Sequence, residues 1–128
     1  MSSTIAVLGA SVVRSKFGNK CVRAYLEAEW TVLPVNPRAD EIEGLAVSRT
    51  LADARVAAGG QLDRIAVYLP PAITGRLLPE IADADATDVF FNPGSADPVG
   101  LEEARELGIA VRDACAIVDI GLSPAQFP

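Results

Sequence analysis

Five short apolar runs, each ending near glycine, proline or asparagine, constrain the fold of this chain most strongly. The runs are continuous rather than alternating and are rich in valine and isoleucine: TIAVLGA, TVLPVNP, RIAVYLPP, TDVFFNPG and GIAVRDA. Strands that are buried on both faces of a parallel sheet have this pattern. Between the runs, apolar residues recur at helical spacing: Phe17, Cys21, Val22, Tyr25 and Leu26; Ile73, Leu77, Leu78 and Ile81; Leu101, Ala104 and Leu107.

Alternating strands and helices predict right-handed crossovers and an α/β fold. We expect a doubly wound, mostly parallel five-stranded sheet with helices on both faces. The 128 residues are enough for one core, so residues 1–128 are expected to form a single domain. Segment 39–63 is expected to hold a short edge strand in EIEGLAVSRT and a short helix in LADARVAA. The last ten residues, DIGLSPAQFP, are expected to form an irregular tail that packs back on the body.

The chain contains no histidine, which removes the Ser-His, Cys-His and histidine–metal arrangements. Its two cysteines, Cys21 and Cys115, lack the spacing of a zinc or redox pair. A net charge of −6 argues against nucleic acid as a partner. The sequence has neither a long apolar run nor a basic segment before its first apolar stretch. We therefore expect no membrane partner and a cytoplasmic protein, and the sequence leaves a homodimer open.

Basic residues are concentrated around the first loop, although the chain as a whole is acidic. Arg14, Lys16, Lys20 and Arg23 lie in or just after this loop, and Arg38 follows the second apolar run. Such a local concentration indicates a small anionic ligand, and a solvated basic face explains it equally well.

The first strand is followed by Gly9, Ala10 and Ser11, but the spacing G-x-G-x-x-G of dinucleotide-binding proteins is absent. In an open α/β sheet, ligands bind beyond the carboxyl ends of the strands, where the strand order reverses. Gly9 permits a tight turn, and the amides that follow it offer a pyrophosphate site. A plain strand-to-helix turn accounts for these residues about as well.

The end of the second strand discriminates better between ligands. NAD sites place an acidic residue there to bind the ribose hydroxyls, whereas this chain has Asn36, Pro37 and Arg38. A guanidinium suits a phosphate on the ribose, which is present in NADP and in coenzyme A (CoA). The alternative is that Arg38 is a surface residue in a turn.

Six blocks of the sequence, taken in order, resemble the small stand-alone CoA-binding domain proteins. They are IAVLGAS, SKFGNKCVRAYLE, VLPVNPRADEIEGL, VYLPP, FFNPGS and ACAIVDIG. The same family is similar to the N-terminal domain of succinyl-CoA synthetase α subunits and of NDP-forming acyl-CoA synthetases. The resemblance implies a Rossmann-like domain that binds CoA at the carboxyl edge of its sheet.

The resemblance also implies a role for each matching position. The pyrophosphate would be held by the first loop, namely Gly9, Ala10, Ser11, Arg14, Lys16 and Phe17. Asn36, Pro37 and Arg38 would meet the ribose and its 3′-phosphate, and Leu69, Pro70 and Ile73 would line the adenine side. Asn92 and Cys115 would face the pantetheine arm, where many relatives carry the longer glutamine at the first of these positions.

The leading hypothesis is a non-catalytic module that binds CoA or an acyl-CoA, because synthetase relatives need further domains and a phosphorylated histidine. The alternative is an NADP-binding reductase or a dinucleotide-sensing domain. The only tyrosines, Tyr25 and Tyr68, are predicted inside a helix and a strand, where they would not serve such a reductase. An enzyme that acts through Cys115 lacks a visible base. That thiol either meets the CoA thiol, which would allow a mixed disulfide, or is a buried small apolar residue.

Overall fold

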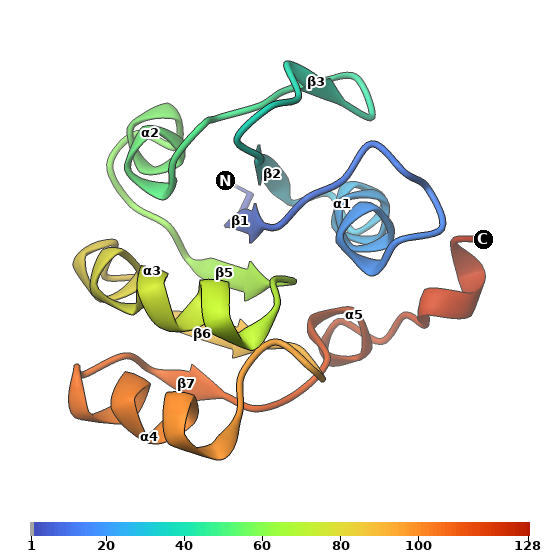
Figure 1. Ribbon diagram of the computed structural model, residues 1–128. Helices are drawn as coiled ribbons and strands as arrows, with labels where there is room; N and C mark the ends of the chain where they lie inside the picture. Colours follow the sequence, from blue (N-terminus) through green and yellow to red (C-terminus); the bar gives the residue numbers. More distant parts are fainter. Residues whose placement is uncertain (1) are drawn as a thin grey trace.

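The computed structural model describes residues 2–128, which surround one five-stranded sheet (Figure 1). The strand order is β2–β1–β5–β6–β7, and all four neighbouring pairs are parallel. The strands are β1 (Thr4–Leu8), β2 (Thr31–Val35), β5 (Arg64–Val67), β6 (Asp88–Phe91) and β7 (Val111–Arg112). They correspond to the five apolar runs, so the predicted doubly wound α/β sheet is confirmed.

Helices cover both faces of the sheet (Figure 1). The chain leaves β1 toward one edge through β2 and then returns to β5 on the other side of β1. The strand order therefore reverses between β1 and β5, where doubly wound proteins bind their ligands. One face carries α1 (Phe17–Glu27) and α5 (Ala116–Asp119), and the other carries α2 (Leu51–Ala57), α3 (Pro71–Asp83) and α4 (Pro98–Glu106).

The expected apolar face of α1 is only partly buried. Cys21, Val22 and Tyr25 are fully buried against the sheet, whereas Phe17 is 56% exposed and Leu26 is 36% exposed. Phe17 is the first residue of the helix and Leu26 the last but one. The helical spacing was therefore correct, but the predicted apolar face extended too far at both ends.

Segment 39–63 differs from the expectation in one respect. It contains the predicted helix, α2, but its strand residues form an antiparallel hairpin of β3 (Glu41–Ile42) and β4 (Leu45–Ala46) instead of an edge strand. The turn residues Glu43 and Gly44 both have positive φ, 50° and 79°, as a tight hairpin turn requires. One isolated parallel bridge, between Val35 and Ser48, links the following segment to β2.

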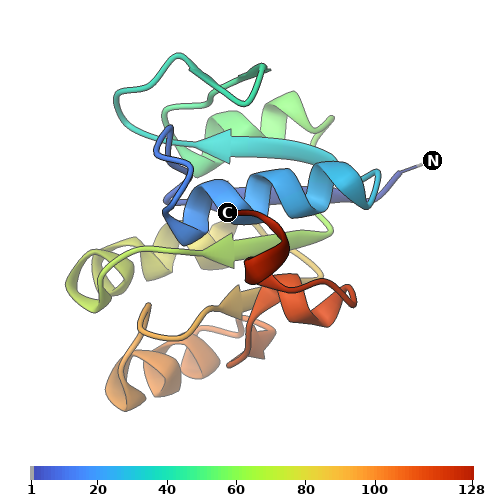
Figure 2. The same cartoon turned by 90° about the vertical axis from the view of Figure 1, so that its right-hand side faces the viewer.

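The C-terminal segment packs back on the body, as expected. Figure 2 shows it lying beside α1. It contains a short 3₁₀ helix, η1 (Pro124–Gln126), followed by Phe127, which is buried in the core on the α1 side. The Phe127 carbonyl accepts a hydrogen bond of 3.0 Å from Arg23 of α1. No helix among residues 2–128 is long and apolar enough to cross a membrane.

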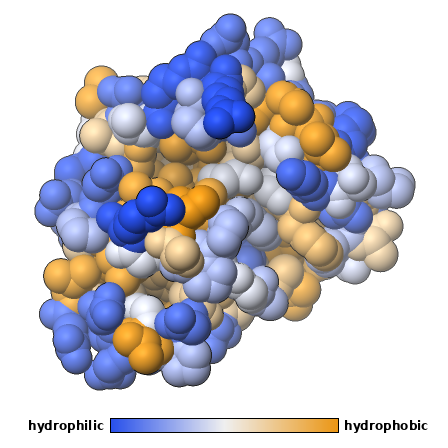
Figure 3. All heavy atoms as spheres, in the orientation of Figure 1, coloured by the Kyte–Doolittle hydropathy of each residue, from blue (hydrophilic) through white to orange (hydrophobic). Residues whose placement is uncertain are grey.

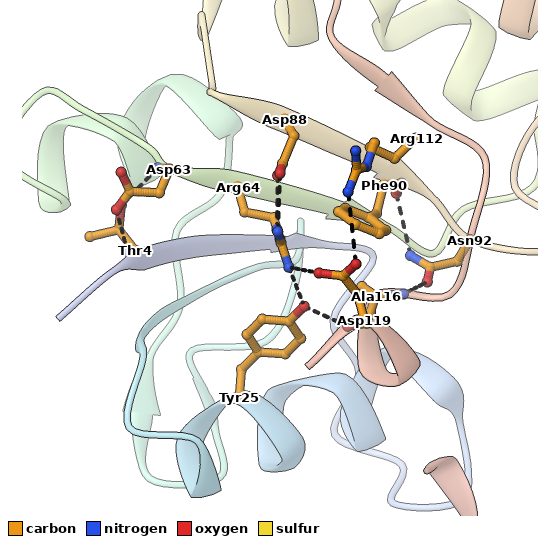
Figure 4. A network of polar contacts seen from close by, with 10 residues as sticks. All are labelled: Thr4, Tyr25, Asp63, Arg64, Asp88, Phe90, Asn92, Arg112, Ala116 and Asp119. Carbon is orange, nitrogen blue, oxygen red and sulfur yellow. Dashed lines mark hydrogen bonds and ion pairs between the residues drawn. The ribbon is translucent and has the colours of Figure 1, made fainter. Parts of the chain in front are cut away.

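Arg64, at the start of β5, joins four elements at the edge of the sheet opposite the strand carboxyl ends (Figure 4). Its guanidinium pairs with Asp88 of β6 and Asp119 of α5, each at 2.8 Å, and donates to the Tyr25 hydroxyl at 3.1 Å. Tyr25 in turn donates to the Ala116 carbonyl at 2.6 Å. Burial raises the pKa of Tyr25, so this donor keeps its proton. The network holds α5 against α1 and the sheet.

Candidate functional site

A cleft of about 670 Å³ opens at the carboxyl edge of the sheet, which faces the viewer in Figure 1. This volume is in the range of small-molecule sites. In Figure 3 the middle of this face is hollowed and largely pale to orange, with hydrophilic residues around it. The lining residues come from the ends of four strands and the starts of α1 and α5: Gly9, Ala10, Ser11, Lys16, Phe17, Gly18, Asn36, Pro37, Val67, Tyr68, Leu69, Pro70, Asn92, Pro93, Gly94, Ser95 and Cys115.

Two glycines shape the floor of the cleft. Gly9 has φ +94°, and a Cβ there would lie 2.5 Å from the Tyr68 carbonyl oxygen of the neighbouring strand end. Gly18, in the first turn of α1, approaches Gly9 even more closely, because its Cβ would lie 2.3 Å from the Gly9 carbonyl oxygen. This pair brings the helix start directly onto the end of β1. The sequence analysis missed Gly18, although a glycine at a helix start after a glycine turn was a usable signal.

The loop between β1 and α1 presents the start of the helix to the cleft. The Ser11 hydroxyl accepts from the Val13 amide at 3.0 Å, and the Val13 carbonyl accepts from the Lys16 amide at 3.1 Å. Within the described chain, the amides of Phe17 and Gly18 donate to no backbone carbonyl. Free amides at a helix start, with Lys16 beside them, favour an anionic group.

Hydrogen bonds and an ion pair connect this loop to Asn19 of α1 and to Glu43 of the β3–β4 hairpin. The buried Asn19 donates to the Ser11 carbonyl at 2.9 Å and to Glu43 at 3.1 Å. Glu43 also pairs with Arg14 at 2.6 Å. Arg14 therefore supports the loop and does not line the cleft, and its predicted contact with a ligand stays a prediction. The sequence analysis missed Asn19 and Glu43, which are far apart in the chain.

Of the three residues that follow β2, two line the cleft and one does not. The Asn36 side chain accepts from the amides of Arg38 and Ala39 at 2.8 and 2.9 Å, and it donates to the Ala10 carbonyl at 2.9 Å. Asn36 and Pro37 line the cleft, whereas Arg38 is exposed outside its lining. The Arg38 guanidinium has no acidic partner within 4 Å in the described chain. Its predicted contact with a ribose phosphate stays a prediction.

The end of β5 contributes Tyr68, Leu69 and Pro70 to the cleft. The placement of Tyr68 inside a strand was wrong, because β5 ends at Val67 and Tyr68 follows at the strand end. Ile73 lies in the first turn of α3, is 37% exposed and does not line the cleft.

Asn92 follows β6 and is almost fully buried. Its amide nitrogen donates to the carbonyls of Val67 and Phe90 at 3.0 and 3.3 Å, and its oxygen accepts from the Ala116 amide at 2.8 Å (Figure 4). This side chain therefore ties together β5, β6 and α5, and its polar atoms are already bonded to backbone groups. Its predicted contact with a ligand stays a prediction.

The two cysteines differ in exposure. Cys115 is partly exposed, precedes α5 and lines the cleft, whereas Cys21 is fully buried in α1, as expected. Burial raises the pKa of the Cys21 thiol to about 12, so it stays protonated at neutral pH. The residues 2–128 contain no group of three or more potential metal ligands.

Two cleft-lining residues have a buried hydroxyl that forms no hydrogen bond. Among the described residues, the Tyr68 hydroxyl and the Ser95 hydroxyl are the buried side-chain polar atoms without a hydrogen bond. Both residues line the cleft. Neither was predicted as a site residue, because a sequence does not show which hydroxyls remain unpaired after folding.

Comparison with known proteins identifies relatives of the whole chain. A family model described as a CoA binding domain matches residues 3–121. No curated protein matches the chain. A Thermus thermophilus protein called cell-free ID.343 is 33% identical, with a TM-score of 0.78, and the match covers 94% of this chain and 89% of that one.

Two further solved structures are informative. A conserved hypothetical protein from Pyrococcus furiosus is 26% identical with a TM-score of 0.78, and the match covers 93% of this chain and 99% of that one. A dinucleotide-forming acetyl-coenzyme A synthetase from Candidatus Korarchaeum cryptofilum is 25% identical with a TM-score of 0.72. That match covers 88% of this chain but only 25% of the synthetase, so this fold corresponds to one part of the larger enzyme.

Proposed function

Because this chain belongs to the CoA-binding domain family, we propose that its cleft binds CoA or an acyl-CoA and that the protein is a non-catalytic binding module. One observation supports this use of the cleft most directly. The close approach of Gly18 to Gly9 places the start of α1, whose first two amides donate to no backbone carbonyl of the described chain, in the lining of the cleft where the strand order reverses. A diphosphate fits such a position because the amides donate to its oxygens and the helix start favours negative charge.

In the proposed complex, the first loop from Gly9 to Phe17 holds the pyrophosphate, with Lys16 as the cation nearest to it. Pro37 and Arg38 meet the phosphorylated ribose, since Arg38 is exposed at the rim and has no acidic partner in the described chain. Leu69 and Pro70 offer an apolar surface on the adenine side. The pantetheine arm extends toward Asn92 and Cys115.

The absence of histidine from the sequence supports a binding role over acyl-CoA synthesis. A synthetase that works through a phosphorylated histidine has no acceptor in this chain. Cys115 is the reactive group that the cleft offers, and none of the lining residues is an acid or a histidine that would act as its base.

The experiment that tests this function measures thermal stabilisation by CoA, dephospho-CoA, NADP and NAD at equal concentrations. A ligand at about 100 times its dissociation constant adds roughly 2.7 kcal/mol to the free energy of unfolding. We expect strong stabilisation by CoA and weaker stabilisation by dephospho-CoA. Stabilisation by NADP alone would replace the proposal with the dinucleotide-binding alternative, which Arg38 also permits.

A further inference from the structure

The chain bends between β2 and β3, and this bend, the 36–40 segment, carries the exposed Arg38. The Asn36 side chain orders the amides of the segment. Its oxygen accepts from the amides of Arg38 and Ala39 at 2.8 and 2.9 Å, and its nitrogen donates to the Ala10 carbonyl at 2.9 Å. These bonds join the segment to the first loop, and a different residue binds its carbonyl groups.

Arg49, which lies between β4 and α2, contacts the 36–40 segment through its guanidinium. Its Nη1 donates to the carbonyl of Asn36 at 3.4 Å and to the carbonyl of Ala39. Its Nη2 pairs with the carboxylate of Asp40. One side chain therefore joins the first residue of the segment to its last two. Strongly hydrophilic residues gather at the top of Figure 3, where Figure 1 shows the chain between β2 and α2.

The backbone next to Arg49 is held by β2. The Ser48 amide donates to the Pro34 carbonyl, and the Asn36 amide donates to the Ser48 carbonyl, each at 3.0 Å. These bonds form the parallel bridge between Ser48 and Val35. Arg49 therefore extends from a position that is fixed relative to the end of β2, and its contacts restrict how far the 36–40 segment can move from the sheet.

The chemistry of these contacts suits arginine better than lysine. A guanidinium has five N–H donors in a fixed plane, whereas the lysine ammonium concentrates its three donors at one point. The ion pair with Asp40 contributes little by itself, because the Asp40 side chain is 90% exposed and water screens the charges. The contribution of Arg49 therefore depends on its bonds to the two backbone carbonyls.

We propose that Arg49 is a positioning residue that holds the 36–40 segment so that Arg38 meets the ribose phosphate of the ligand. This inference rests on the proposed function. Asp40 already pairs with Arg49, whereas Arg38 has no acidic partner within 4 Å in the described chain. Arg38 is therefore the arginine that binds the phosphate, and Arg49 orders the backbone that carries it. Two parallel hydrogen bonds to a phosphate require a defined place and angle of the guanidinium, which such supporting contacts provide.

Calorimetric titration of the full chain with CoA and with dephospho-CoA tests this role. We expect Arg49→Ala and Arg49→Lys each to lower the preference for CoA about 3- to 10-fold, as the loss of one hydrogen bond to the phosphate predicts. Affinity for dephospho-CoA should change less than about twofold. Arg49→Lys keeps the positive charge, so a preference equal to that of the parent protein would show that charge alone acts and would overturn the proposal.

Arg55→Lys is the matched control for these variants. The Arg55 guanidinium also donates to two backbone carbonyls, those of Gly60 and Asp83, but none of these residues lines the cleft. The substitution should leave both affinities unchanged. An equal loss of preference in Arg55→Lys would show that the effect does not depend on the 36–40 segment, and would overturn the proposal.

A double substitution distinguishes positioning of Arg38 from an independent contact with the ligand. If Arg49 acts through Arg38, then Arg49→Ala should not weaken CoA binding further in a protein that already carries Arg38→Ala. A further loss in that protein overturns the inference, as does an equal loss of affinity for both ligands in the single variants. A parent protein that binds CoA and dephospho-CoA equally well overturns it while leaving CoA binding intact. A parent protein that binds neither overturns the proposed function as well.

Discussion

The first turn of α1 packs on the end of β1 so closely that a Cβ on Gly18 would lie 2.3 Å from the carbonyl oxygen of Gly9. Real Cβ atoms do not approach an oxygen to this distance, so any side chain at Gly18 must displace the helix from the strand. The contact therefore fixes the position of the helix start relative to the cleft.

We expect Gly18→Ala to lower the free energy of unfolding by about 1–3 kcal/mol through overpacking. CoA binding should weaken as well, because the helix amides move away from the proposed pyrophosphate position. Urea unfolding and calorimetric titration measure the two effects. The matched control is Gly75→Ala in α3, where a Cβ would meet no atom within 4 Å. That substitution should stabilise the protein by up to about 1 kcal/mol. Equal effects of the two substitutions would contradict the packing argument.

Arg38→Ala should remove the preference for CoA over dephospho-CoA. A guanidinium bound to a phosphate contributes roughly 1.5–3 kcal/mol, so its removal lowers CoA affinity by about 10- to 100-fold. The loss is smaller where the pair is exposed to solvent, as Arg38 is. Affinity for dephospho-CoA should stay unchanged. Arg105→Ala removes the same charge from an exposed position on α4 and should leave both affinities unaltered. Equal loss for both ligands would show that Arg38 does not recognise the 3′-phosphate.

Arg64→Met should destabilise the fold by about 1–3 kcal/mol, because it leaves the half-buried Asp88 without an ion-pair partner and removes the shorter of the two ion pairs of Asp119. Arg64 also stacks between the rings of Trp30 and Phe90. Arg112→Met is the control: its guanidinium lies 3.9 Å from Asp119 and is mostly exposed, so its loss should cost less than about 1 kcal/mol. Urea unfolding of both variants decides whether the network carries this stability.

Stability should fall as the pH rises above about 9. Burial raises the pKa of Cys21 from 9.0 to about 12, so the folded protein keeps a proton that the unfolded chain releases in this range. A group whose pKa is raised on folding stabilises the fold fully below its unfolded pKa and loses this contribution as the pH increases. Cys21→Ala should therefore unfold with a weaker pH dependence between pH 8 and 9.5, as measured by urea unfolding.

The same burial predicts how the thiols react. Iodoacetamide at pH 8 should leave Cys21 unmodified in the folded protein and modify it in urea, as mass spectrometry of the peptides would show. CoA should slow any modification of Cys115 if it occupies the cleft. Rapid labelling of Cys21 without denaturant would contradict its placement in the core.

The five strands of the sheet could be predicted from the sequence because they are buried on both faces and are therefore continuous apolar runs. It also located most of the cleft, since residues such as Gly9, Asn36 and Leu69 stand at the ends of these runs. Helix α5 was missed because its four residues, Ala116–Asp119, are too few to show a periodicity.

The partners of side chains were less predictable. Arg14 was expected at the ligand, but it pairs with Glu43, a residue 29 positions later that reaches it only through the hairpin turn. Asn92 was expected to face the pantetheine arm, which stays a prediction, and the sequence did not show that its polar atoms bind backbone groups of three elements. Which partner a polar side chain binds depends on the folded geometry, and no local pattern in the sequence indicates it.

The anchoring of the first loop by Asn19 and Glu43 has a thermodynamic consequence for recognition. The protein's own contacts already order this loop, so a ligand that binds there does not have to immobilise it. Less conformational entropy is lost on association, and more of the interaction between the loop amides and a phosphate remains as affinity. Glu43 has the same sign of charge as the proposed ligand, but it does not line the cleft. It favours binding indirectly, because its contacts with Asn19 and Arg14 hold the loop in place.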